Sequence, residues 1–111
     1  MGTMSKIKAF SLLCRKDLLF FTYASKNKRF EVYWATPEPK VLSNDWWLVL
    51  NDILNKKINV FKIPANSISI GQVKLNKKGL PHFEIVYNDP LYTDRMSNIQ
   101  FKKWLIGAFS Y

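Results

Sequence analysis

Apolar and polar residues follow several different spacings along the chain, and the most regular helical spacing lies near its midpoint. Within residues 43–57, five apolar residues recur with the three- and four-residue spacing that places side chains on one face of an α-helix: Trp46, Val49, Leu50, Ile53 and Leu54. Small polar residues precede this run, where they cap a helix, and two lysines follow it, where they suit the negative end of the helix dipole. The pattern therefore predicts a central helix over residues 43–57.

The segment before this helix reads as three strands joined by basic turns. Residues 7–14, 18–24 and 30–35 are rich in aromatic and β-branched side chains, as strands are. In the third strand Phe30, Val32 and Trp34 alternate with Glu31, Tyr33 and Ala35, so the two sets face opposite sides. The segment predicts a three-stranded meander, which Pro37 and Pro39 end.

The segment after the central helix repeats this order. Residues 58–63, 68–75 and 83–87 have strand patterns, with a bulge expected at Gly71-Gln72 and a turn over residues 76–79. In the last of these strands His82, Glu84 and Val86 lie on the face opposite Phe83 and Ile85. Residues 94–109 then place four apolar side chains on one helical face, namely Phe101, Trp104, Leu105 and Ala108.

These elements predict an α+β fold of six mostly antiparallel strands in two three-strand blocks, each followed by a helix. Two pairs of segments about fifty residues apart resemble one another, residues 6–10 with 57–61 and residues 28–33 with 81–86, which suggests a βββα-βββα pseudo-repeat. The layout resembles that of PUR-type and Whirly-type nucleic-acid-binding proteins, although neither family's diagnostic motif is present. We expect residues 4–111 to form a single domain and interpret residues 1–3 as an expression scar.

Charge and cysteine content narrow the choice of partner and compartment. The 17 lysines and arginines exceed the 8 acidic residues by nine, which favours nucleic-acid phosphates or an acidic protein as partner. No apolar run is long enough to span a bilayer, so no membrane partner is expected. Cys14 is the only cysteine, which excludes an intramolecular disulfide and fits the cytoplasm. No cofactor and no metal ion is expected.

His82 and Glu84 are the candidates for catalysis, and they are weak ones. They share one face of a strand, with Asp89 and Asp94 following nearby, and such a group can move a proton or hold a divalent metal ion. The simpler interpretation is that both residues are the solvent-facing positions of a half-buried strand. Serine hydrolase, P-loop and dinucleotide-binding signatures are absent because the four glycines are scattered. The sequence gives catalysis no positive support.

Nucleic-acid binding is the function that the sequence favours. Aromatic residues lie among basic residues in the first three strands, a combination with which single-strand binders stack bases and attract phosphates. We expect Tyr33 to point outward beside Glu31 and to stack on a base. The expected nucleic-acid-binding residues are Arg15, Lys16, Lys26, Lys28, Arg29, Tyr33, Lys74, Lys77 and Lys78.

Two other functions remain open. The first is a small protein-interaction or inhibitor module, of the kind that phages and plasmids encode, which binds an acidic host protein. Trp47 and Leu48 lie off the apolar face of the predicted central helix and would form its partner-binding site, or the interface of a homodimer. The second is a small nuclease or toxin-like enzyme.

Overall fold

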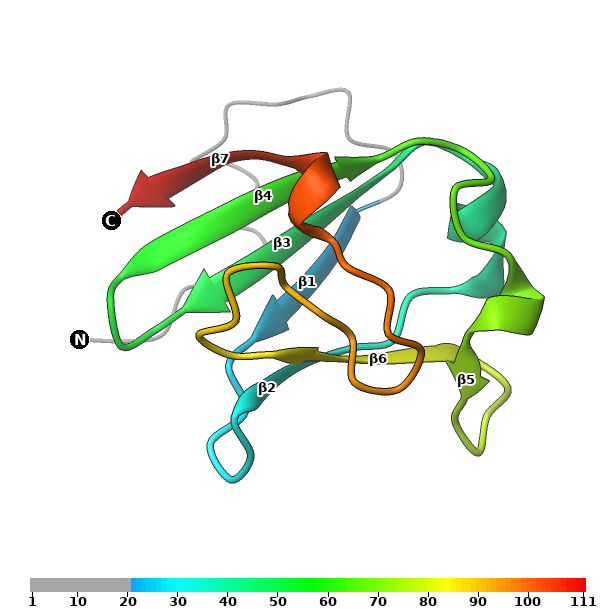
Figure 1. The fold of residues 1–111 in the computed structure, drawn as a ribbon, viewed down its shortest axis with the longest axis horizontal. Helices are drawn as coiled ribbons and strands as arrows, with labels where there is room; N and C mark the ends of the chain where they lie inside the picture. The colour runs from blue at the N-terminus through cyan, green and yellow to red at the C-terminus, as the bar shows by residue number, and fades with distance from the viewer. Residues whose placement is uncertain (1–20) are drawn as a thin grey trace.

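The computed structural model describes residues 21–111, whose seven strands form two sheets (Figure 1). The larger sheet has the order β1-β3-β4-β7, with β1 (Phe21–Ser25), β3 (Trp46–Asp52), β4 (Lys57–Ile63) and β7 (Leu105–Ser110). The smaller has the order β2-β6-β5, with β2 (Val32–Ala35), β6 (Pro81–Val86) and β5 (Lys74–Leu75). The β1–β3 pair is parallel and the other pairs are antiparallel. Within the described residues the only helical elements are short 3-10 turns, η1 (Pro39–Ser43), η2 (Ile70–Gln72) and η3 (Lys102–Trp104).

The main hydrophobic core lies between the two sheets. Trp46, Leu48 and Leu50 of β3 point into it and meet Phe83 and Ile85 of β6. The rings of Trp46 and Phe83 stack with centroids 6.4 Å apart. The three-stranded sheet thus has one face in the core and one face outside, as its alternating burial along β6 indicates.

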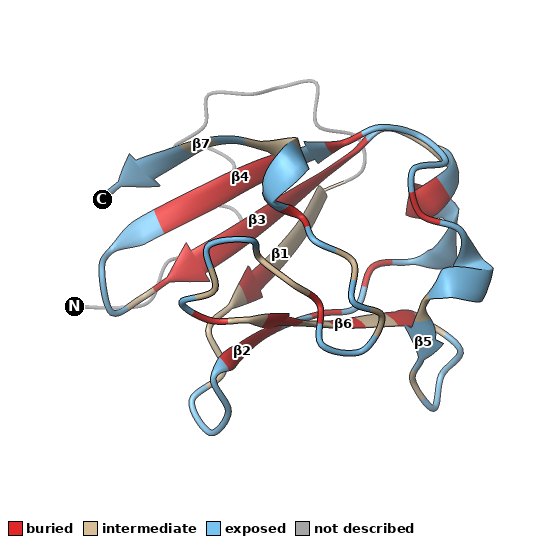
Figure 2. Cartoon of the chain, in the orientation of Figure 1, coloured by how far each residue is buried: buried red, intermediate tan, exposed pale blue. Residues whose placement is uncertain are grey.

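The predicted central helix is wrong, because residues 46–52 form strand β3. All seven residues of β3 are buried, and Figure 2 shows the strand buried along its length. Alternate side chains enter two clusters: Trp46, Leu48 and Leu50 face the smaller sheet, whereas Trp47 and Val49 pack on the opposite face with residues of β4. A strand buried on both faces has a continuous apolar run, which by chance also contains a helical spacing.

The predicted second helix is also wrong. Residues 94–109 contain a turn, η3 and strand β7, which pairs with β4 at the edge of the larger sheet. Asp94 starts the turn: its buried carboxylate accepts hydrogen bonds from the backbone N–H of Glu84 (2.7 Å) and the hydroxyl of Ser97 (2.6 Å). With both long helices absent from the described residues, the α+β class is replaced by a mainly β fold.

The pseudo-repeat and its βββα-βββα order are overturned by the strand pairing. Two segments that resemble each other, residues 28–33 and 81–86, lie in one sheet, where β2 pairs antiparallel with β6. The expected meander is likewise not formed by β1 and β2, since β1 belongs to the other sheet and runs parallel to β3. The strand expected at residues 7–14 lies outside the described residues. Residues 68–75 form η2 and only a two-residue strand, β5.

Three local predictions are confirmed. Strand β4 occupies residues 57–63, and β6 buries Phe83 and Ile85 while His82, Glu84 and Val86 stay half-buried. The turn over residues 76–79 has its glycine at a positive φ of 78°, and Gly79 N–H donates to the carbonyl of Asn76 at 3.0 Å. Among residues 21–111, no helix has the length and apolar character required to cross a bilayer.

Candidate nucleic-acid interface

The outer face of the three-stranded sheet gathers aromatic and charged side chains. In the β2–β6 pair Trp34 lies opposite Glu84, and in the β5–β6 pair Lys74 lies opposite His82. Directly paired residues of neighbouring strands project to the same side of a sheet, and so do residues two apart on one strand. These four side chains therefore share the face that points away from the core.

Phe30, which lies two residues before the start of β2, adds its ring to this face. Its ring stacks on Trp34 with centroids 5.8 Å apart and planes inclined by 29°. The two rings are 39% and 43% exposed. The guanidinium carbons of Arg29 and Arg95 lie 5.4 Å and 6.0 Å from the centroid of Phe30. We call Phe30, Trp34, His82, Glu84 and Arg95 the aromatic face.

Glu84 links the charged residues of the aromatic face. Its Oε1 accepts hydrogen bonds from Arg95 through Nε at 2.6 Å and lies 2.5 Å from Nη2, and its Oε2 lies 2.8 Å from His82 Nε2. Burial acts to raise the pKa of this carboxyl, but the hydrogen bonds from His82 and Arg95 outweigh it, and the pKa lies below its usual value. Glu84 is therefore ionised at neutral pH, and Arg95 balances its charge.

The environment of His82 argues against a role in proton transfer. An ionised carboxylate only accepts hydrogen bonds, so the His82 Nε2 that contacts Glu84 carries a proton. The other ring nitrogen, Nδ1, is buried and has no partner among the described residues. Edge contact with Trp34, whose ring centroid lies 6.1 Å away, covers the imidazole further. One nitrogen is engaged and the other is inaccessible, so this geometry offers no free base to a substrate.

Two basic loops extend from the ends of the smaller sheet. The β1–β2 loop carries Lys28 and Arg29, and the β5–β6 loop carries Lys77 and Lys78, all of them exposed. Figure 1 shows both loops projecting beyond the sheet on the side away from the larger sheet. No salt bridge within the described residues involves these four cations or Lys74. The aromatic face therefore has uncompensated positive charge at both ends.

Several expected nucleic-acid-binding residues lie in or beside this region. Lys28, Arg29, Lys74, Lys77 and Lys78 are exposed there, and Lys26 is half-buried in a 2.6 Å ion pair with Glu31. Arg15 and Lys16 lie outside the described residues. Whether any of them contacts nucleic acid remains a prediction.

The expectation that Tyr33 points outward is wrong. Tyr33 is 2% exposed and belongs to the core, while its neighbour Trp34 takes the outer position. The alternation along this strand was predicted correctly, but the assignment of its two faces was reversed. Arg95 was missed altogether, because the hydrogen bond that joins it to Glu84 spans a turn that the sequence pattern presents as a helix.

The expected partner-binding site at Trp47 and Leu48 is not a surface. The two residues are 6% and 0% exposed, because β3 is covered on both faces. Lys62 Nζ also lies 5.6 Å from the Trp47 ring centroid. Burial removes the reason for assigning these residues to a partner or to a homodimer interface.

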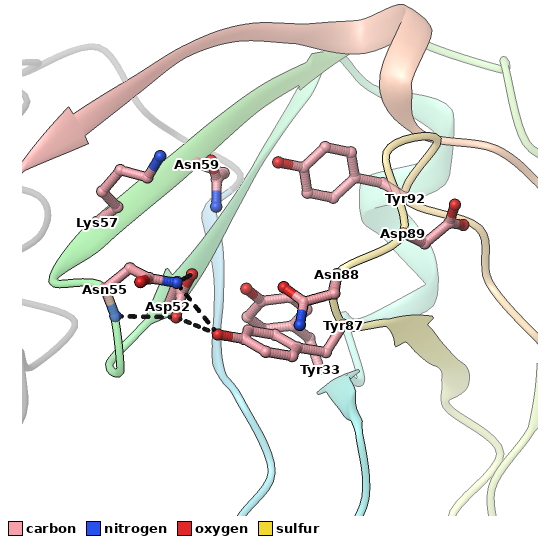
Figure 3. A pocket seen from close by; sticks show the side chains of 9 residues that line it. All are labelled: Tyr33, Asp52, Asn55, Lys57, Asn59, Tyr87, Asn88, Asp89 and Tyr92. Atoms are coloured by element: carbon pink, nitrogen blue, oxygen red, sulfur yellow. Dashed lines mark hydrogen bonds between the residues drawn. The ribbon is translucent and has the colours of Figure 1, made fainter.

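A second feature of the surface is a pocket of about 200 Å³ at the other side of β2. Three tyrosines line it, Tyr33 of β2 and Tyr87 and Tyr92 after β6 (Figure 3). The remaining lining residues are Asp52, Asn55, Lys57, Asn59, Asn88 and Asp89. We call this feature the tyrosine pocket.

The buried carboxylate of Asp52 organises one wall of the tyrosine pocket. Its Oδ1 accepts a hydrogen bond from the Tyr87 hydroxyl at 2.8 Å, and its Oδ2 accepts one from Asn55 Nδ2 at 2.7 Å. Burial and the hydrogen bond to Asp52 raise the pKa of Tyr87 to about 12. Burial, with the nearby Asp52 charge, raises the pKa of Tyr33 as well. The tyrosines of the pocket therefore remain uncharged hydrogen-bonding groups at neutral pH.

Among the described residues, neither region brings together the group of His82, Glu84, Asp89 and Asp94 that the sequence suggested. Asp89 accepts backbone hydrogen bonds in its own loop and Asp94 is buried in a turn, so neither joins His82 and Glu84. Within residues 21–111 no cluster of three histidine, cysteine or acidic side chains is arranged to hold a metal ion. The aromatic face instead has two partly exposed rings, Phe30 and Trp34, with the exposed cations Arg29 and Arg95 beside Phe30. Comparison with protein-family models, with curated proteins and with solved structures finds no match for this chain.

Proposed function

We propose that this protein binds single-stranded nucleic acid across the aromatic face and the two basic loops beside it. The observation that carries the proposal is the exposed Phe30–Trp34 stack with Arg29 and Arg95 near the Phe30 ring. Surfaces of this kind bind single strands by stacking bases on rings and placing phosphates on cations. A cytoplasmic setting is part of the proposal and rests on the single cysteine.

Residues on this surface support both parts of the proposed interaction, base stacking and phosphate attraction. Stacking contributes roughly 1–3 kcal/mol per base, and Phe30 and Trp34 are the partly exposed rings that this proposal assigns to it. The cations of the loops, with Lys74, attract phosphates without reading sequence. Because the faces of paired bases are covered within a duplex, the rings favour a single strand over a double strand.

An acidic protein is the second candidate partner for the same face. Tryptophan and arginine dominate the binding energy of many protein interfaces. Here Trp34 stacks on Phe30, and the Arg95 guanidinium lies 6.0 Å from the Phe30 ring centroid while donating a hydrogen bond to Glu84. The positive charge at both ends of the face suits an acidic surface equally well. No comparable observation favours a nuclease or toxin-like enzyme.

Two ring deletions and a matched control test the proposal. We expect Phe30→Ala and Trp34→Ala each to weaken binding of a fluorescently labelled single-stranded oligonucleotide by about 5- to 150-fold, the equivalent of roughly 1–3 kcal/mol. Phe109→Ala is the control, because Phe109 is 44% exposed but lies on β7 of the other sheet. Its affinity should match that of the unaltered protein.

The contrary results are equally clear. Absence of binding by the unaltered protein at about 50 mM salt, where phosphate attraction is strong, would refute the proposal. Equal losses for Phe30→Ala and Phe109→Ala would show that the aromatic face is not the site. A discrete protein captured after nuclease treatment, and lost with Trp34→Ala, would favour the acidic-protein partner instead.

A further inference from the structure

Arg95 is held at the aromatic face by both its backbone and its side chain. Its backbone N–H donates to the carbonyl of Glu84 at 3.0 Å, and a bridge between Ile85 and Asp94 holds the adjacent backbone against β6. Its Nε donates to Glu84 Oε1 at 2.6 Å, and its Nη2 lies 2.5 Å from the same oxygen. The guanidinium is therefore oriented before a ligand arrives, which lowers the entropy that binding through it would cost.

The contacts with Glu84 occupy only one side of the guanidinium. Among the described residues the Arg95 side chain has no other hydrogen bond or ion pair, and 48% of it is exposed. A guanidinium has five N–H donors and no acceptor, so Nη1 and the second N–H of Nη2 remain as a fork of two parallel donors. This fork matches a ligand edge that has two adjacent acceptors.

The charge of Glu84 makes Arg95 a weaker attractor of phosphate than its neighbour Arg29. The Arg95–Glu84 ion pair has no net charge, whereas no salt bridge within the described residues involves Arg29. Both guanidinium carbons lie near the Phe30 ring, at 6.0 Å for Arg95 and 5.4 Å for Arg29. A strand on this surface would therefore place phosphate on Arg29, and Arg95 keeps its hydrogen-bonding capacity for a neutral group.

A stacked base is the neutral group nearest to the fork. Trp34 lies directly opposite Glu84 in the β2–β6 pair, and Phe30 stacks on Trp34. A base that stacks on this pair of rings lies beside Arg95. Bases of a single strand that stack on aromatic side chains keep their edges available for hydrogen bonds.

Two kinds of base have the required pair of adjacent acceptors. Guanine presents O6 and N7, and cytosine presents O2 and N3. Adenine has its amino group beside N1 and N7, and uracil and thymine have a ring N–H between their two carbonyls. A fork of two donors makes one hydrogen bond to such an edge and meets a donor with its other arm.

We infer that Arg95, positioned by Glu84, gives single-strand binding a preference for cytosine and guanine, through two hydrogen bonds to a base stacked on Phe30 and Trp34. The inference rests on the proposed function, because it concerns a base that the aromatic face has already bound. Sequence preference is nevertheless measured separately from binding itself.

The experiment compares labelled strands that are alike in size and charge. Oligodeoxycytidine and oligodeoxyuridine of about 12 nucleotides, within the usual range of single-strand sites, differ only in the donors and acceptors of their bases. We expect the cytidine strand to bind at least about fivefold more tightly in fluorescence anisotropy. A uridine strand with one guanine should likewise bind more tightly than the same strand with 7-deazaguanine, which has a C–H in place of N7.

The two arginines beside Phe30 provide a matched pair of variants. Arg95→Ala should remove the preference for cytosine and leave the slope of log affinity against log salt unchanged. Arg29→Ala should weaken binding of both strands equally and make that slope shallower by about 0.7. Arg95→Lys keeps the charge and a donor for Glu84 but loses the fork, so the preference should fall to about twofold or less. Melting curves establish that each variant is folded, and Arg95→Lys retains the test if Arg95→Ala unfolds.

Three results would overturn the inference and leave the proposed function standing. They are equal binding of the cytidine and uridine strands, an unchanged preference in folded Arg95→Lys, and a shallower salt slope with an unchanged preference in Arg95→Ala, which would place a phosphate on Arg95. Failure of the unaltered protein to bind any of the strands would refute the proposed function and this inference together.

Discussion

The salt dependence of oligonucleotide binding is the sharpest quantitative consequence of the aromatic face and its loops. Five cations beside the face have no salt-bridge partner among the described residues: Lys28, Arg29, Lys74, Lys77 and Lys78. Each phosphate contact on a single strand contributes about −0.7 to the slope of log affinity against log salt. Five contacts predict a slope of about −3.5, so raising the salt from about 50 to about 200 mM weakens binding roughly 130-fold.

Removing both lysines of the β5–β6 loop should change this slope by a calculable amount. Lys77→Ala with Lys78→Ala leaves three contacts and a slope of about −2.1, which corresponds to roughly a 20-fold loss over the same salt range. The turn itself is retained, because it depends on Asn76 and on the positive φ of Gly79. Fluorescence anisotropy with a labelled single strand at four or more salt concentrations measures both slopes.

An adjacent pair of lysines elsewhere supplies the control. Lys102 and Lys103 are exposed on η3, which lies beside the larger sheet, away from the two loops (Figure 1). Their replacement by alanine lowers the net charge by the same amount and should leave the slope unchanged. If both double variants reduce the slope equally, the protein attracts phosphates by its total charge and the loops are not the site.

Three further predictions concern stability. Trp47→Ala should destabilise the protein by about 3–5 kcal/mol in chemical denaturation, because Trp47 is buried in the sheet, whereas Trp34→Ala should cost about 1 kcal/mol or less. Similar denaturation midpoints for the two variants would contradict the difference in burial between Trp47 and Trp34. The folded-state pKa of Glu84 is lowered from 4.5, so the contribution of this ionised carboxylate to folding stability is present above that pH and is lost as the pH falls through the folded-state pKa. Glu84→Gln should therefore flatten the profile of melting temperature against pH between about pH 7 and 3, and parallel profiles for the two proteins would argue against the contacts with His82 and Arg95. The pKa of Tyr87 is raised from 10.0 to about 12, so the contribution of its neutral hydroxyl to folding stability is complete below pH 10 and is lost as the pH rises toward 12. Tyr87→Phe should reduce this loss of stability at alkaline pH, and an identical loss in the variant would exclude Tyr87 as its source.

Strand positions were easier to predict from the sequence than strand partners. The alternation of residues 81–86 identifies β6 because one face of that strand is buried and the other is not. Strand β3 gives no such alternation, since both of its faces are covered, and its five consecutive apolar residues 46–50 satisfy a helical spacing as well as a strand. The helix predicted over residues 43–57 is therefore wrong because burial on both faces of a strand is a property of the tertiary structure.

The candidate sites depend on the same tertiary information. Alternation separates Tyr33 from Trp34 but does not say which of them faces the core; the packing of Tyr33 near Tyr87, with ring centroids 5.7 Å apart, settles it. The tyrosine pocket combines β2, the end of β3, β4 and the loop after β6, and no spacing in the sequence joins these segments. His82 and Glu84 were paired correctly because two residues of one strand suffice to place them together.

The length of β6 sets the shortest strand of nucleic acid that can engage the whole interface. Its six residues extend for about 20 Å, and the two basic loops lie near its ends. Phosphates along one stacked strand are spaced by about 3.4 Å, so about six nucleotides cover that distance, and fewer do when the strand is stretched. Between the loops, Arg95 balances Glu84, so the middle of the face is nearly neutral. Affinity should therefore rise with oligonucleotide length until both loops are reached, and then level off.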